Sequence, residues 1–139
     1  MEKIIAGVVI MLMIACGGNK SAAGKSPLYQ VLTVQNDGGA NIRFYEILTE
    51  EKEIAMLRGD ENLKNKVAAS DMAKSNYIIL NMGEKPTSGY SITIDNVVET
   101  ADKVIITLKE KEPSGMAAQV ISYPYSIVRI NSKKPIEIK

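Results

Sequence analysis

Few side chains in this sequence are of the types that carry out chemistry. Its 139 residues include no histidine and one cysteine, Cys16, so the Ser–His and Cys–His pairs of nucleophilic catalysis and the usual zinc ligands are missing. Carboxylate pairs such as Glu50 with Glu51, or Glu110 with Glu112, stand among lysines, where solvated surface charge is the ordinary role of these residues. The sequence therefore predicts a protein that is not an enzyme and that uses no metal or cofactor.

The single cysteine stands at the end of an apolar N-terminal run. Lys3 precedes the apolar stretch 4–14, which is much shorter than the roughly 20 residues that a membrane-spanning helix needs and instead suits the core of a signal peptide. The stretch leads into the letters MIACG, which end with Cys16 and Gly17. Two apolar residues, a small residue and Cys resemble a bacterial lipobox, with Met13 where Leu is usual.

The lipobox resemblance implies cleavage before Cys16, diacylglycerol on its sulfur and an acyl group, such as palmitate, on its new amino end. We therefore expect a signal peptide over 1–15, a flexible glycine-rich tether over 16–27 and a β-rich domain over 28–139. The implied location is the bacterial cell envelope, with the membrane as a partner, and Gly17 after the cysteine favours the outer membrane. The alternatives are an uncleaved anchor or a free thiol.

Composition excludes one large class of partner. The formal net charge is +1, and no basic stripe or block of like charge appears along the chain. Nucleic-acid binding proteins normally carry such a patch, so we expect no nucleic-acid partner.

The hydrophobic pattern predicts a mainly β fold with a short helical insert. Expected strands cover 28–35, 41–48, 76–82, 90–95, 104–109, 116–122 and 126–131, with a short edge piece over 135–139. The first two strands flank the turn-forming residues 36–39 and are predicted to form a hairpin. One or two short helices are expected within 49–69. Strands at this spacing predict a single-domain antiparallel β-sandwich or open barrel.

One turn between expected strands combines several specialised residues, read as GEKPTSGY over 83–90. Pro86 fixes a backbone angle, Gly89 can adopt a positive φ, and Thr87 and Ser88 can hydrogen-bond locally. Tyr90 then begins an alternating strand. The plainer interpretation is a well-made connection between core strands, and the functional one is a loop that contacts a partner.

From about residue 67 to residue 131, the order of motifs resembles the C-terminal domain of PrcB, a lipoprotein subunit of a bacterial protease complex. The resemblance rests on YIILNMG (77–83), EKPTSGYSI (84–92), VIITL (104–108), PSGM (113–116), QVISYPY (119–125) and the closing strand 127–130. It implies an envelope lipoprotein that accompanies a secreted, subtilisin-like protease. Residues 28–69 match only in general texture.

The same loop is similar to the N-P-T-T-G-Y loop of chagasin-type inhibitors, which wedges into the cleft of papain-like proteases from an immunoglobulin-like sandwich. Lys85 and Ser88 depart from that pattern, and no tryptophan is present to complete it. An aromatic–proline element follows later at 123–125, where the plainer interpretation is a strand bend with core tyrosines. The predicted partner-binding residues are Lys85, Pro86, Thr87, Ser88, Gly89, Tyr90, Tyr123, Pro124 and Tyr125.

Three hypotheses follow from the sequence. The first is a membrane-anchored accessory subunit of a secreted protease complex. The second is a protease inhibitor that uses the loop 85–90, and the third is a structural envelope lipoprotein with no link to a protease.

Overall fold

The computed structural model describes residues 27–139, so the predicted signal peptide (1–15), Cys16 and the tether up to residue 26 lie outside the described residues. The strands are β1 (Tyr29–Gln35), β2 (Arg43–Leu48), β3 (Asn76–Met82), β4 (Ser91–Glu99), β5 (Val104–Lys111), β6 (Tyr125–Ile130) and β7 (Ile136–Ile138). The helices are α2 (Glu51–Met56), η2 (Leu57–Gly59), η3 (Glu61–Leu63) and α3 (Ala69–Met72). Within 27–139, no helix is both long enough and apolar enough to span a membrane.

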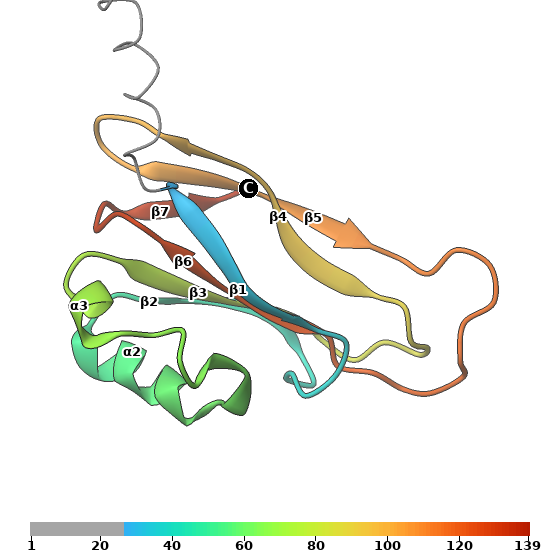
Figure 1. The fold of residues 1–139 in the computed structure, drawn as a ribbon. Coiled ribbons are helices and arrows are strands. Elements are labelled where there is room, and N and C mark those ends of the chain that lie inside the picture. Colours follow the sequence, from blue (N-terminus) through green and yellow to red (C-terminus); the bar gives the residue numbers. More distant parts are fainter. Residues whose placement is uncertain (1–26) are drawn as a thin grey trace, which may run out of the picture.

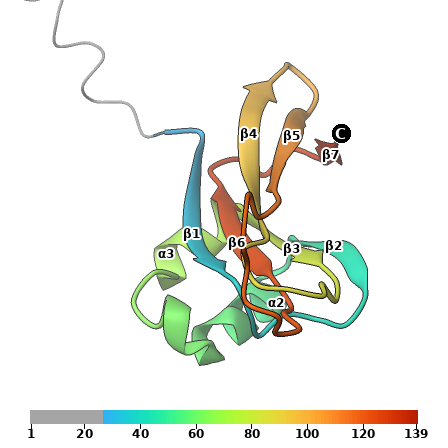
Figure 2. The same cartoon turned by 90° about the vertical axis from the view of Figure 1, so that its right-hand side faces the viewer.

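The fold has three layers. One sheet has the strand order β1-β6-β3-β2, a second has the order β4-β5-β7, and the short helices cover the face of the first sheet that is turned away from the second (Figures 1 and 2). The pairing is antiparallel except between β5 and β7, which run parallel. This architecture confirms the predicted mainly β sandwich, and the described sheets do not close into a barrel.

The middle of the first sheet is buried on both faces. In β3, Tyr77 faces the helices, while Ile78 and Leu80 face the second sheet, and all three side chains have no exposed surface. Side chains alternate across a strand, so a strand covered on both faces must be apolar at nearly every position. This explains the almost uninterrupted apolar sequence that predicted β3.

The predicted hairpin between 28–35 and 41–48 is wrong. These segments do form β1 and β2, but β1 pairs with β6 and β2 pairs with β3. The physical reason is burial: β3 and β6 are buried at nearly every position, and they pair with each other at the centre of the sheet. The more exposed β1 and β2 are left as the two edges, on opposite sides of that pair.

The helical insert expected within 49–69 is confirmed, and α3 extends it to Met72. Glu50 is the N-cap of α2 and forms a capping box with Glu53. Asp60 caps η3, with its side chain accepting a hydrogen bond from the backbone N–H of Asn62. Ile54 and Leu63 lie fully buried against the first sheet.

The predicted strand over 116–122 is also wrong. This segment is irregular, and its only sheet-like pairing among the described residues is a bridge between Ser122 and Lys85. The backbone of this segment bonds instead to the turn 83–90, through Ser122 with Lys85 and Ala118 with Ser88. The predicted strands 90–95 and 104–109 both extend further than expected, and 135–139 supplies the edge strand β7.

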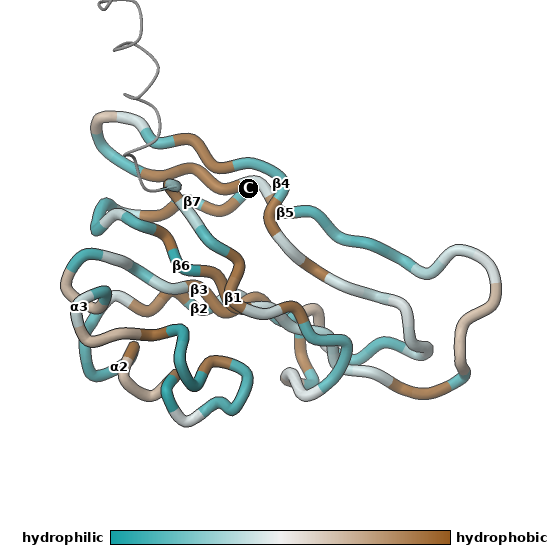
Figure 3. The backbone as a smooth tube through the Cα atoms, in the orientation of Figure 1, coloured by the Kyte–Doolittle hydropathy of each residue, from teal (hydrophilic) through white to brown (hydrophobic). Residues whose placement is uncertain are grey.

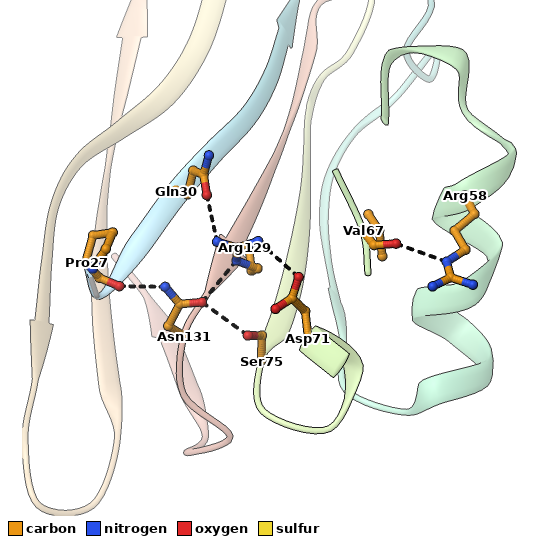
Figure 4. A network of polar contacts seen from close by, with 8 residues as sticks. All are labelled: Pro27, Gln30, Arg58, Val67, Asp71, Ser75, Arg129 and Asn131. Carbon is orange, nitrogen blue, oxygen red and sulfur yellow. Dashed lines mark hydrogen bonds and ion pairs between the residues drawn. The ribbon is translucent and has the colours of Figure 1, made fainter. Parts of the chain in front are cut away.

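Two arginines hold the layers together. Arg129 on β6 bonds Gln30 of β1, Asn131 and Asp71 of α3, and Asn131 reaches back to Pro27, the first described residue (Figure 4). These bonds anchor the beginning of the described chain to the centre of the first sheet.

Arg43 of β2 joins the two sheets. It forms a two-pronged ion pair with Glu110 of β5, with its Nη1 2.6 Å from Oε1 and its Nη2 2.8 Å from Oε2. The guanidinium lowers the pKa of the Glu110 carboxyl below its ordinary value of 4.5, mainly by hydrogen bonding to the charged form.

The Arg43–Glu110 pair predicts a pH dependence of stability. Because the pKa of Glu110 is lower in the folded state, the pair contributes its full stabilisation above about pH 4.5 and loses it as the pH falls through the folded pKa. Both side chains are about two-fifths exposed, so we expect Glu110→Gln to cost only about 0.5 kcal/mol at neutral pH and to flatten the acid limb of the stability curve. Urea unfolding at a series of pH values measures both the loss of stability at neutral pH and the slope of the acid limb. Glu112→Gln is the matched control, and identical curves for both variants would contradict the assignment.

Candidate functional site: two paired loops

The pairing of β3 with β6 places two loops at the same end of the molecule. Asn81 near the end of β3 lies opposite Tyr125 at the start of β6, so the chain leaving β3 and the chain entering β6 are neighbours. We call residues 83–90 the proline loop, residues 112–124 the return loop, and both together the paired loops. They project beyond the sheets, at the end of the molecule opposite to the start of β1 (Figures 1 and 2).

Hydrogen bonds join the two loops directly. Lys85 and Ser122 exchange backbone bonds, with N···O distances of 2.8 and 2.9 Å. Ser88 donates its backbone N–H to Ala118 O at 3.1 Å, and the Ser122 hydroxyl donates to Thr87 O at 2.8 Å. Three of the predicted binding residues therefore hold the proline loop in place, which gives Lys85, Thr87 and Ser88 a positioning role.

Gly89 allows a close approach between the loops. Its φ is +94°, a region that other residues adopt only at a cost, and a Cβ at this position would lie 2.7 Å from Cβ of Pro113. Glycine is therefore required here both by the backbone angle and by the contact with the return loop.

The surface of the paired loops is rich in apolar groups. In the proline loop, Pro86 and Gly89 are exposed. In the return loop, Met116 is fully exposed, and Val120 and Ile121 are 61% and 53% exposed. Figure 3 shows this apolar stretch on a loop whose neighbouring residues are mostly polar. The three return-loop residues were not among the predicted binding residues, because their segment was expected to be a strand.

The predicted aromatic residues do not gather in one place. Tyr90 packs partly buried against the core between the sheets, with Lys85 Nζ 5.3 Å from its ring centre. Tyr125 faces the helices and is 9% exposed, while Pro124 is fully buried. Only Tyr123 is part of the loop surface, where its hydroxyl donates to Glu84 at 3.2 Å. Whether these residues contact a partner stays a prediction.

The electrostatics of the two tyrosines follow from these surroundings. Burial raises the pKa of the Tyr125 hydroxyl, which is bonded to both Asp60 and Asn62. Loss of solvent and the neighbouring carboxylates Glu84 and Asp37 raise the pKa of Tyr123. Both phenols therefore stay neutral at physiological pH and act as hydrogen-bond donors. Across residues 27–139, no three carboxylate, His or Cys side chains converge as metal ligands would.

Comparison with known proteins agrees with the resemblance found in the sequence. Residues 76–131 match the family model PrcB C-terminal. The matched segment runs from the start of β3 to just beyond β6 and includes both paired loops, whereas β1, β2 and the helices lie outside it.

One curated relative also matches. It is the "Uncharacterized protein MJ1373" of Methanocaldococcus jannaschii, 40% identical over 62 residues, which are 45% of this chain and 38% of the archaeal protein. The matched segment thus spans well under half of that relative's length. No solved structure matches the chain.

Glycine substitutions test how the paired loops are held. We expect Gly89→Ala to lower the free energy of unfolding by about 2–4 kcal/mol, because the positive φ costs about 1–2 kcal/mol and the overlap with Pro113 adds to it. Gly115 also has a positive φ, but the space around a new Cβ is open. Gly115→Ala should therefore lose only the free energy that the positive φ costs. Gly59→Ala meets neither problem and should be neutral. Equal losses at Gly89 and Gly115 in chemical denaturation would show that the Pro113 contact is unimportant.

Proposed function

We propose that this protein is a non-enzymatic accessory subunit of a secreted protease complex, held at the bacterial envelope by a lipid on Cys16, and that it binds its protein partner through the paired loops. The observation that carries the proposal is that residues 76–131, which match the PrcB C-terminal family, contain both loops and the hydrogen bonds that join them.

The physical properties of the paired loops support a binding role. Met116, Val120 and Ile121 expose apolar area on one loop, and such area on a soluble domain often marks a protein-contact site. The proline loop is already fixed by its bonds to Ser122 and Ala118, so little conformational entropy is lost when a partner docks. The main contribution of these loops would be contact area presented in a fixed shape.

The position of the proposed anchor suits this arrangement. The described chain begins at Pro27, which is tied to Asn131 beside the start of β1, at the end of the molecule away from the paired loops (Figure 1). A lipid on Cys16 would attach the protein from that end and leave the paired loops directed away from the attachment point. A subtilisin-like protease is the partner that the family resemblance suggests.

A second candidate function is protease inhibition by the proline loop. Its exposed positions, Pro86 and Gly89, flank residues that are pinned to the return loop, and a rigid projecting turn is what a wedge inhibitor needs. An inhibitor would slow a papain-like or subtilisin-like enzyme in a peptide-cleavage assay, whereas an accessory subunit would bind its protease without blocking the cleft.

Site-specific cross-linking tests the proposed binding surface. A photoreactive amino acid at Pro86 or Met116 in the full-length protein should capture a secreted protease in intact cells of the host, identified by mass spectrometry. The same group at Asp102, which is exposed in the β4–β5 turn at the opposite end, should capture it far less. If neither loop position captures a protease, the proposal is contradicted and the hypothesis of a structural lipoprotein is favoured.

Metabolic labelling tests the anchor separately. A clickable palmitate analogue should label the wild-type chain, and the labelled protein should be recovered in the membrane fraction. Cys16→Ser should remove the label, since no other cysteine is present. Met13→Leu, which introduces the residue usual in a lipobox, should keep it. A mature protein that retains residues 1–15 without acylation would disprove the lipid anchor.

A further inference from the structure

A groove lies on the helix-covered face of the first sheet and adjoins the base of the return loop, where Gly39 of its lining donates its backbone N–H to Tyr123 O at 2.8 Å. The groove is not part of the surface used in the proposed function. Its volume is about 490 Å³. Phe44, Glu46 and Leu48 of the edge strand β2 form one wall, and Leu57 and Asp60 stand on the helical side. Further lining comes from Glu53, Asn81 and Tyr125.

The strand beside this groove has an open edge. β2 ends the first sheet, since it pairs with β3 on one side and with no described strand on the other (Figure 2). The backbone N–H and C=O groups on that outer side can pair with an added strand. Such a strand would direct every second side chain to the groove face, beside Phe44 and Glu46.

The charge of the groove is one-sided. Its lining holds the three carboxylates of Glu46, Glu53 and Asp60 and no Lys or Arg. Glu53 accepts bonds from backbone N–H groups, and Asp60 accepts from Asn62 N–H and the Tyr125 hydroxyl, all of which are neutral donors. None of the three forms an ion pair with a described residue. A cationic partner would be electrostatically complementary.

The groove also holds an unused donor. Asn81 is 4% exposed, and its Oδ1 accepts the backbone N–H of Ala40 at 2.9 Å, which fixes the orientation of the amide. The Asn81 side chain lines the groove, and its Nδ2 donates a hydrogen bond to no described residue. An amide donor at this position is suited to a carbonyl oxygen, the acceptor that every peptide unit offers.

We propose that the groove and the open edge of β2 together bind an extended peptide segment of a partner protein, with a Lys or Arg facing Glu46 and an apolar side chain facing Phe44. A second copy of this chain is a poorer occupant. Pairing two β2 edges antiparallel brings the same acidic face together, and like charges repel across such a contact.

Synthetic peptides test this directly with the full-length protein in detergent. The probe is a fluorescent seven-residue peptide, Thr-Leu-Thr-Lys-Thr-Leu-Thr, and its partner for comparison has Glu in place of Lys. Fluorescence anisotropy should show saturable binding of the Lys peptide and weaker binding of the Glu peptide. No saturable binding of the Lys peptide, or equal affinity for both peptides, would overturn the proposal.

Variants locate the contact. Glu46→Lys should weaken binding of the Lys peptide about five-fold and strengthen binding of the Glu peptide, since Glu46 is exposed and its replacement should not disturb folding. Phe44→Ser should also weaken binding. The matched controls are Asp95→Lys and Val98→Ser, two exposed positions on β4, which should change nothing. Unaltered affinity in both groove variants would exclude this site.

Two further measurements separate the parts of the proposal. N-methyl groups on alternate backbone amides remove the N–H donors along one edge of the Lys peptide. The peptide should bind much more weakly when that edge is the one that would pair with β2. Unchanged binding with either edge methylated would rule out strand addition. In sedimentation of the detergent-solubilised protein, Glu46→Lys should not change the oligomeric state. A dimer that this substitution disrupts would assign the groove to a second copy of the chain.

Discussion

The structure depends on the burial of the central strand pair β3–β6 on both faces. One face packs against the helical insert through Tyr77 and Ile127, and the other packs against the second sheet through Ile78 and Val128. Because neither strand has a face left for solvent, these two must lie at the middle of their sheet, and every other element is arranged around them. The more exposed strands β1 and β2 become edges, and the helices and the second sheet become the two outer layers.

The register of that same pair creates the candidate binding surface. Asn81 opposite Tyr125 places the end of β3 next to the start of β6, although β4 and β5 separate them along the chain. The proline loop and the return loop are therefore forced into contact, and the bonds of Lys85, Thr87 and Ser88 fix them there. Lys85, Thr87 and Ser88 thus serve to position the loop, and in the proposed function the exposed apolar side chains of the return loop would supply the contact area.

The two candidate binding regions differ in physical character. The paired loops offer exposed apolar groups on a rigid projection, which suits docking against a folded protein. The groove beside β2 offers an open strand edge, apolar walls and uncompensated carboxylates, which suits an extended cationic segment. The two regions adjoin where Gly39 of the groove lining bonds to Tyr123 of the return loop.

The sequence by itself determined the segments of β1 to β7, together with one wrong strand over 116–122, and it placed short helices within 49–69, because these features follow from local periodicity and turn residues. It also carried the family match over 76–131, through motifs such as the proline loop. Only the tertiary structure decided that β1 and β2 do not pair, that 116–122 is an exposed loop, and that Tyr125 belongs to the core while Tyr123 does not. Strand partners depend on competition among all strands for the doubly buried positions, and that competition is settled by packing over long sequence distances rather than by the residues of any one turn.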